Sequence, residues 1–231
     1  IYYAAVDESK ELAKIHGPYD SFKGSPFSEG ILQYHMWGLE NKDLLMGFDW
    51  DKLVEEVKQY GTRNSLLTAL MPTASTAQIM GNYEGFEPYL TNIFVRTTLA
   101  GEFIVINDYL VKDLEDLNLW NEDMRKLIII YNGSIQHIDS IPQNIKNKYK
   151  TAFELSLKSI IKQSVERGPF IDQSQSMNLF FGSPNSTNLY SALMYGWKKG
   201  IKTGCYYLRS LPADEAIKYG FQVKNTETKT K

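Results

Sequence analysis

The chain has 231 residues, and its 25 Lys and Arg residues nearly balance its 27 Asp and Glu residues. A hydrophobic share of 43% and a charged share of 23% are ordinary for a soluble globular protein of one large domain or two small ones. The net charge of −2 gives no electrostatic reason to expect nucleic acid or a membrane surface as a partner. The sequence has no secretory signal and no run near the ~20 apolar residues of a membrane span.

The first part of the chain is expected to contain two helices and a strand. Ile1–Ile15 carries its apolar residues near one helical face, and Asp51–Tyr60 does the same before Gly61. Ser65–Leu70 is a short apolar run with the length and composition of a buried strand. Pro72 is expected to end this strand, because proline has no N–H to donate to a neighbouring strand.

A turn rich in hydroxyl groups follows this strand, in the stretch L-M-P-T-A-S-T-A-Q. Thr73, Ser75 and Thr76 precede a run of helix-forming residues, so hydroxyl groups and free backbone N–H groups are expected together at a helix start. Helix N-termini bind anions for this reason. The turn has no lysine and is therefore not a Walker loop. Ordinary helix capping by Thr73 or Ser75 is the alternative, and the local sequence is consistent with both.

Helices and strands are expected to alternate through the rest of the chain. Thr91–Val95 is typical of an extended segment, and Asn121 is a candidate cap for the helix that follows it. The patterns predict helices at Glu122–Tyr131, Asn144–Glu166 and Asn185–Lys199, and strands within Phe170–Phe181 and at Tyr206–Leu208. Asn144–Glu166 is expected to be one long helix. Alternation of this kind predicts a largely parallel α/β sheet.

Two adjacent tyrosines stand near the end of the chain, in the stretch Y-G-W-K-K-G-I-K-T-G-C-Y-Y-L-R. Neighbours in a strand point to opposite faces, so the simplest expectation places one tyrosine in the core and one at the surface. Rings that stack and pass an electron and a proton between Tyr206 and Tyr207 need an unusual local geometry. Gly204 could permit such a geometry.

A polar row lies in the motif I-D-Q-S-Q-S. We expect Asp172, Gln173 and Ser174 to form an internal hydrogen-bond network, because buried polar groups are almost always paired. A direct contact with substrate is the weaker alternative. The three histidines lack metal-ligand spacing, so no metal site is predicted.

Several longer motifs resemble the large, catalytic subunit of class I ribonucleotide reductase of the eukaryotic or viral type. They are G-P-Y-D-S-F-K-G-S-P-F-S-E-G-I-L-Q-Y (Gly17–Tyr34), R-N-S-L-L (Arg63–Leu67), M-P-T-A-S-T-A-Q-I (Met71–Ile79), N-G-S-I-Q (Asn132–Gln136), R-G-P-F-I-D-Q-S-Q-S-M-N (Arg167–Asn178) and G-W-K-K-G-I-K-T-G-C-Y-Y-L-R (Gly196–Arg209). The resemblance runs almost from end to end but covers only the C-terminal part of that subunit.

The resemblance implies a fold. The family fold is a ten-stranded α/β barrel, to which this segment would contribute strands of the second half and the flanking helices. We therefore assign residues 1–224 to the C-terminal part of the catalytic barrel domain. Residues 225–231 carry no apolar side chain, and we expect them to form a disordered tail.

The resemblance also implies an activity. The family reduces ribonucleoside diphosphates to deoxyribonucleoside diphosphates for DNA synthesis in the cytoplasm, using a radical that a separate di-iron small subunit generates. ATP and deoxynucleotides act as effectors, and thiols supply the electrons. Tyr206 and Tyr207 match the tyrosine pair that passes the radical. Thr73, Ala74, Ser75 and Thr76 match the loop that holds the substrate diphosphate.

The single cysteine limits what this segment can do alone. The family chemistry needs a radical thiol, a redox pair and a tail pair, and Cys205 cannot form an intrachain disulfide. Cys205 stands where family members more often carry methionine, so we interpret it as a small apolar strand residue. The segment is expected to hold no cofactor, and the isolated chain is expected to be inactive. A phosphate-binding α/β domain without catalysis is the alternative function.

The resemblance implies two protein partners: other large subunits in the complete enzyme, and the small subunit, whose acidic, aromatic C-terminal tail enters a groove. We expect that groove between the helices Asn144–Glu166 and Asn185–Lys199. Its predicted basic rim and apolar floor are Lys158, Lys162 and Lys198, with Ile161, Leu193 and Met194. A merely solvated lysine face is the alternative.

Overall fold

The computed structural model describes residues 1–44 and 47–211. The described residues form two compact units, one of Ile1–Glu87 with Ser156–Arg209 and the other built on Pro88–Leu155. The predicted tail, 225–231, lies outside the described residues. Within the described ranges, no helix combines the length and the apolar composition of a membrane span.

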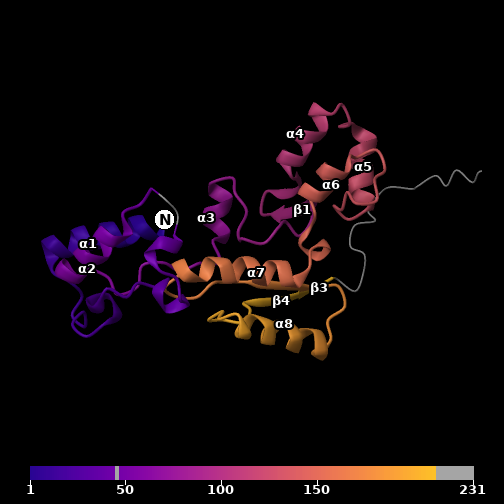
Figure 1. Ribbon diagram of the computed structural model, residues 1–231. Coiled ribbons are helices and arrows are strands. Elements are labelled where there is room, and N and C mark those ends of the chain that lie inside the picture. The colour runs from indigo at the N-terminus through magenta and orange to yellow at the C-terminus, as the bar shows by residue number, and fades with distance from the viewer. Residues whose placement is uncertain (45–46, 212–231) are drawn as a thin grey trace, which may run out of the picture. The chain divides into compact units, whose positions relative to one another are not determined.

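The first unit contains five α-helices and two short strands among its described residues (Figure 1). They are α1 (Tyr2–His16), α2 (Trp50–Tyr60), α3 (Ala74–Ile79), α7 (Leu157–Arg167), α8 (Ser186–Lys198), β3 (Asn178–Phe181) and β4 (Tyr207–Ser210). Short 3-10 turns connect them at η1 (Pro26–Glu29), η2 (His35–Trp37), η3 (Asn41–Asp43) and η5 (Gly168–Phe170).

The N-terminal core of this unit forms where α1 packs against α2. Val6 of α1 and Leu53 and Val57 of α2 are almost completely buried, and the ring of Tyr34 fills the space beside them. Gly61 ends α2 with a positive φ of 77° and donates its N–H to the carbonyl of Val57. Both helices that the sequence predicted here are confirmed.

The predicted strand Ser65–Leu70 is wrong, apart from one parallel bridge between Leu70 and Gln175. The segment is held next to residues 172–176, but a side chain replaces part of the expected backbone ladder. Leu67 and Thr68 donate their N–H groups to the carboxylate of Asp172, at 2.7 and 3.2 Å. Because Asp172 takes these two donors, regular strand pairing is reduced to a single bridge.

The predicted long helix Asn144–Glu166 is also wrong, since the chain forms α6 (Gln143–Lys148) and then starts again as α7. Side-chain caps explain the break. The Glu154 side chain accepts from the N–H of Thr151 in a capping box, and Ser156 caps α7 by accepting from Ser159. Hydroxyl side chains that bond the backbone locally compete with a continuous helix.

The second unit combines a hairpin with three helices. Its elements are β1 (Ile93–Thr98), β2 (Gly101–Ile106), α4 (Asp108–Asp116), α5 (Glu122–Ile130), α6 and the turn η4 (Ala152–Glu154). The hairpin is antiparallel, from Ile93 opposite Ile106 to Thr98 opposite Gly101. The extended segment at Thr91–Val95 is confirmed, as is the Asn121 cap, which accepts from Met124 N–H at 2.9 Å.

The predicted strand within Phe170–Phe181 and the predicted helix Asn185–Lys199 are confirmed as β3 and α8. Figure 1 shows α7 and α8 beside β3 and β4. The largely parallel sheet is not formed by the described residues, which contain two sheets of two strands each, β1–β2 and β3–β4. The β1–β2 pair is antiparallel, so alternation of elements was a poor guide to strand direction here.

Candidate functional site

The predicted phosphate turn is exposed at the start of α3. Thr73 directly precedes the helix, and Ala74, Ser75 and Thr76 form its first turn. No side chain caps this helix, because the Thr73 hydroxyl donates to the carbonyl of Glu84 at 3.2 Å. The alternative of ordinary capping by Thr73 or Ser75 is therefore not found. First-turn amides have no acceptor within the helix, so they and the two exposed hydroxyls of Ser75 and Thr76 face solvent together.

The two tyrosines contact each other. The ring centroids of Tyr206 and Tyr207 lie 4.3 Å apart with an interplanar angle of 61°, and both side chains are half exposed. The simple expectation of one core and one surface tyrosine is therefore wrong. A hydrogen bond to Tyr207 raises the pKa of the Tyr206 hydroxyl above its usual value. The guanidinium of Arg209 lies 5.3 Å from the centre of the Tyr207 ring, where a cation–π contact is favourable.

Local backbone geometry explains how neighbouring rings meet. The strand β4 begins only at Tyr207. Tyr206, one residue before β4, donates its N–H to the carbonyl of Met177 at 2.6 Å. Gly204 does not adopt a positive φ, so its backbone conformation is open to other residues. A Cβ atom at this position would lie 2.8 Å from Leu193 Cδ2 on α8, and this end of the leucine side chain can move to relieve the contact. Cys205 is half-buried just before β4, with a free thiol.

Asp172 is the centre of a hydrogen-bond network, as the sequence predicted. Its carboxylate accepts from Leu67 and Thr68, and its own N–H donates to the Thr68 hydroxyl at 3.0 Å. The Tyr2 hydroxyl also bonds the carboxylate, and burial together with this negative charge raises the pKa of Tyr2. Gln173 and Ser174 are exposed and contribute only backbone hydrogen bonds.

Lys202 extends the network on the other side and was not singled out from the sequence. Its ammonium donates to the backbone carbonyls of Ile171, at 2.8 Å, and Asp172. The Gln33 side-chain oxygen accepts from it at 3.0 Å in the amide orientation that also satisfies Trp37. Burial among these neutral acceptors lowers the pKa of Lys202, although the charge of Asp172 opposes the shift. The sequence did offer a signal that Lys202 differs from the helical lysines. It follows Ile201 in a loop between two glycines.

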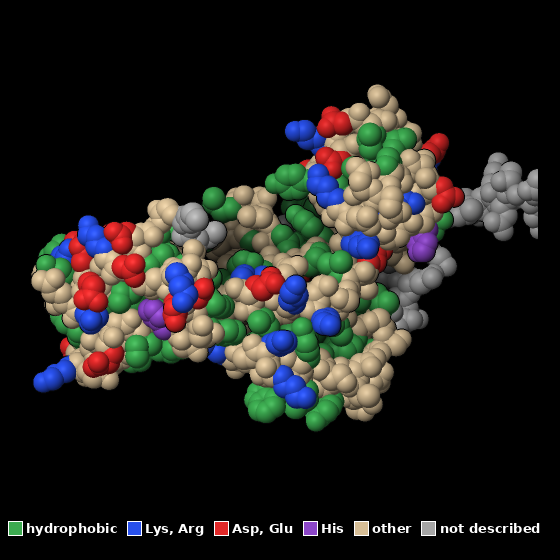
Figure 2. Space-filling model, viewed as in Figure 1, with side chains coloured by type: hydrophobic (Ala, Val, Ile, Leu, Met, Phe, Trp, Pro, Cys, Tyr) green, Lys and Arg blue, Asp and Glu red, His purple; other side chains and the backbone are tan. Residues whose placement is uncertain are grey.

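The predicted groove residues lie on α7 and α8, which pack directly against each other. Lys158, Lys162 and Lys198 are exposed, and Figure 2 shows Lys and Arg side chains over this part of the visible face, next to hydrophobic ones. Leu193 and Met194 are half-buried. Ile161 is only 1% exposed, because it lies in the helix contact, 3.8 Å from the Cβ position of Gly196.

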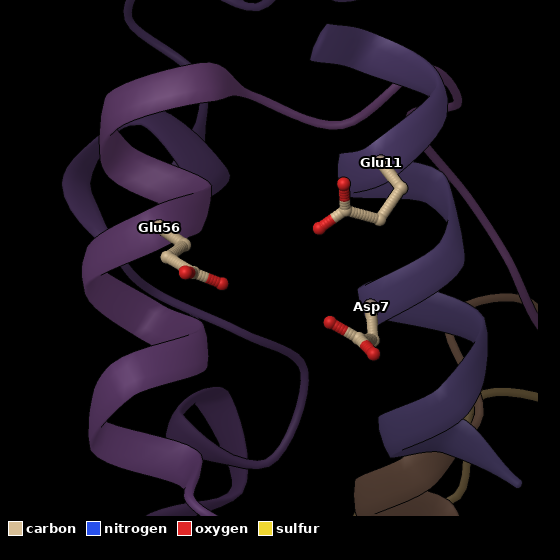
Figure 3. A group of neighbouring side chains, drawn as sticks. All are labelled: Asp7, Glu11 and Glu56. Carbon is tan, nitrogen blue, oxygen red and sulfur yellow. The ribbon is translucent and has the colours of Figure 1, made fainter.

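An acidic group on α1 and α2 is close enough to hold a metal ion. Asp7, Glu11 and Glu56 point toward one another (Figure 3). The ammonium of Lys10, whose side chain is 4% exposed, lies 2.6 Å from Asp7 and Glu56 and 2.9 Å from Glu11. A lysine therefore already supplies the positive charge. Burial opposes this charge, but the carboxylates outweigh burial and raise the pKa of Lys10. Its place on the buried face of α1, between Val6 and Ala13, was the signal that sequence reasoning missed.

Comparison with known sequences supplies the family. The family profile described as "Ribonucleotide reductase, barrel domain" matches residues 1–207. The chain belongs to this family. The ribonucleotide reductase large subunit of Plasmodium falciparum (isolate Dd2) is 53% identical over 221 residues, which cover 95% of this chain and 27% of the relative. The large chain of Schizosaccharomyces pombe is 51% identical, with 95% and 27% covered.

A viral relative and a solved structure also belong to the ribonucleotide reductases. The large subunit of Acanthamoeba polyphaga mimivirus is 48% identical over 99% of this chain and 26% of the relative. The class Id ribonucleotide reductase alpha subunit of Actinobacillus ureae has a TM-score of 0.59 and 25% identity, covering 90% of this chain and 34% of that one. The chain thus spans about a quarter of the curated relatives it matches. Its fold is part of the ribonucleotide reductase α/β barrel.

The first prediction concerns Lys10 in this ribonucleotide reductase segment. Lys10→Met should lower the free energy of unfolding at pH 7, because it leaves three partly exposed carboxylates to repel one another without their buried cation. Urea unfolding followed by circular dichroism measures the loss. Lys42→Met is the matched control, since it removes a surface ion pair with Glu40 and should change stability by less than about 1 kcal/mol.

The pH dependence gives a second readout of the same variant. Hydrogen bonds from Lys14 and Lys10 lower the pKa of Glu11 to about 2, so in the wild type their stabilisation is present above about pH 4.5. It is lost as the pH falls toward 2. In Lys10→Met the carboxylates repel one another until they are protonated, so its defect should shrink at about pH 4. A defect of equal size at both pH values would contradict the charge explanation.

Proposed function

We propose that this chain is the part of a ribonucleoside-diphosphate reductase large subunit that holds the substrate diphosphate and passes the radical. Its membership in the family and the contact between Tyr206 and Tyr207 carry the proposal. Two phenols in contact through a hydrogen bond can exchange an electron and a proton: the oxidised ring gains both, and its neighbour loses both. Tyr206 is a neutral phenol at neutral pH, so its oxidation to a neutral radical releases a proton as well as an electron.

The substrate would be held by the exposed turn Thr73–Thr76. A diphosphate needs several donors on one side and no competing carboxylate among them. The first-turn amides of α3 and the hydroxyls of Ser75 and Thr76 meet this requirement. Thr73 has a different role, because its hydroxyl bonds the Glu84 carbonyl and fixes the shape of the loop.

The second prediction tests the substrate loop. In a full-length large subunit that contains this chain, the double variant Ser75→Ala with Thr76→Ala should weaken nucleoside diphosphate binding. Each lost hydrogen bond to a charged group is worth roughly 1.5–3 kcal/mol, or about ten- to a hundred-fold in affinity. Isothermal titration calorimetry measures the change. Ser21→Ala, at an exposed serine outside the loop, is the control. Unchanged affinity in the double variant would defeat the assignment of the loop.

The third prediction tests the radical path and separates it from a binding role without catalysis. Tyr206→Phe and Tyr207→Phe keep the ring but remove an exposed hydroxyl, so each should fold as the wild type does. In the full-length subunit, with the small subunit and a thiol reductant, each should abolish deoxynucleotide formation while nucleotide affinity stays unchanged. Tyr190→Phe, at an exposed tyrosine of α8, should remain active. Substantial turnover in both variants would favour the phosphate-binding alternative.

We propose further that the small subunit docks its acidic, aromatic tail on the face formed by α7 and α8. The exposed ammonium groups of Lys158, Lys162 and Lys198 would speed the approach of an acidic peptide. Leu193 and Met194 are half-buried and offer apolar contact at the surface, while Ile161 supports the helix pair from below. Within the chain, the Lys158 ammonium lies 5.8 Å from the centre of the Tyr195 ring, and the Lys162 ammonium lies 3.6 Å from the Glu166 carboxylate. Both contacts are on the exposed face of the helix pair, so an acidic peptide would compete with them.

The fourth prediction tests this surface. A synthetic peptide with the sequence of the partner's acidic tail should bind the folded chain, more tightly at low salt than at physiological salt. Lys158→Gln with Lys162→Gln should weaken binding and reduce its salt dependence, as fluorescence anisotropy can measure. Lys126→Gln on α5 removes one exposed lysine from the other unit and should have no effect. Absence of binding at low salt would exclude this surface.

A further inference from the structure

One segment of the first unit is hydrogen-bonded on both sides to the parts of the chain that carry the proposed function. We call residues Asp172–Met177 the central segment. On one side the N–H of Leu70 donates to the Ser174 carbonyl at 3.2 Å, and the N–H of Ser176 donates to the Leu70 carbonyl at 2.7 Å. Leu70 stands three residues before Thr73, where the substrate loop begins.

The other side of the central segment holds the tyrosines. The Thr203 hydroxyl donates to the Gln175 carbonyl at 3.1 Å, and the N–H of Tyr206 donates to the Met177 carbonyl at 2.6 Å. The substrate loop and the tyrosine pair are therefore attached to opposite sides of the same few residues. A shift of the central segment along its own direction would move both.

Two charged side chains determine where the central segment begins. The Asp172 carboxylate fixes Leu67 and Thr68 on the substrate side, through charge-assisted bonds that are roughly twice as strong as neutral ones. The Lys202 ammonium fixes the tyrosine side, by bonding the Ile171 and Asp172 carbonyls. Asp172 thus bonds Leu67 and Thr68, on the side of the substrate loop, through its carboxylate, and Lys202, on the side of the tyrosines, through its backbone carbonyl.

We propose that Asp172 and Lys202 are positioning residues that tie the substrate-phosphate loop and the tyrosine pair to the central segment. The inference rests on the proposed function and adds to it a separate role for each of the two residues. Asp172 controls how well the loop is placed for the diphosphate. Lys202 controls how well Tyr206 is placed for radical transfer. Neither residue touches the substrate or the reacting oxygens.

The test separates the two roles in a full-length large subunit. Asp172→Asn keeps the backbone carbonyl for Lys202 but loses the charged acceptor, so nucleoside diphosphate affinity should fall roughly ten-fold, the effect of one weakened bond to a charged group. Lys202→Met keeps the apolar stem and loses the donors. It should lower kcat by roughly ten-fold or more with nucleotide affinity unchanged. Asp20→Asn and Lys23→Met, at exposed positions of one loop, are the matched controls.

Amide hydrogen exchange measures how firmly the backbone is held on each side of the central segment, and it does not depend on activity. Asp172→Asn should speed exchange at Leu67 and Thr68, and Lys202→Met should speed it at Tyr206, each without affecting the other side. If Asp172→Asn does not fold, Thr68→Val tests the same junction, because it removes the hydroxyl that bonds the Asp172 N–H.

Three outcomes would overturn the inference. Wild-type affinity in Asp172→Asn, when the Ser75 and Thr76 double variant has lost affinity, would reject Asp172 as a positioning residue while the substrate loop stands. Unchanged affinity in both would reject the proposed loop and the inference with it. An equal fall in Tm and in active fraction for Asp172→Asn and Lys202→Met, without the split between affinity and turnover, would leave only a structural role.

Discussion

The carboxylate of Asp172 replaces a stretch of backbone ladder, and the arrangement of the first unit depends on it. An extended segment normally satisfies its N–H groups with the carbonyls of a neighbouring strand. Here one ionised side chain accepts from Leu67 and Thr68, and it also bonds the Tyr2 hydroxyl of α1. The carboxylate of Asp172 thereby holds together Tyr2, Leu67 and Thr68, which lie far from it in the sequence. Loss of the charge would leave partly buried donors without an adequate acceptor, which is costly.

Two lysines of the same unit show different ways to accommodate a positive charge. Lys10 is enclosed by three carboxylates, which stabilise its ammonium, and the ammonium takes the place that a metal ion would have between them. Lys202 is surrounded by neutral carbonyl groups, and its pKa falls because burial dominates. The first lysine holds α1 to α2. The second joins the chain before the tyrosines to Ile171 and Asp172, at the start of the central segment.

The proposed functional groups are exposed, whereas the groups that position them are partly or fully buried. Thr73–Thr76 and the tyrosine pair lie at the surface of the first unit. Asp172 is half-buried behind them, and Leu179 and Phe180 of β3 are buried beside the central segment. This division is typical of sites in which functional side chains are held in place by packed and hydrogen-bonded neighbours.

The sequence by itself determined the family and the helices α1, α2, α5 and α8, because these depend on local patterns and long motifs. The same motifs located the turn that we propose for the substrate and the tyrosine pair that we propose for the radical. It failed at Asn144–Glu166, where hydroxyl caps stopped a helix that periodicity favoured, and at Ser65–Leu70, where a carboxylate from residue 172 took the strand's donors. Only the tertiary structure decided that Tyr206 meets Tyr207 and that Lys10 and Lys202 are anchors. Those outcomes depend on contacts between segments distant in the chain, which no local pattern of residues encodes.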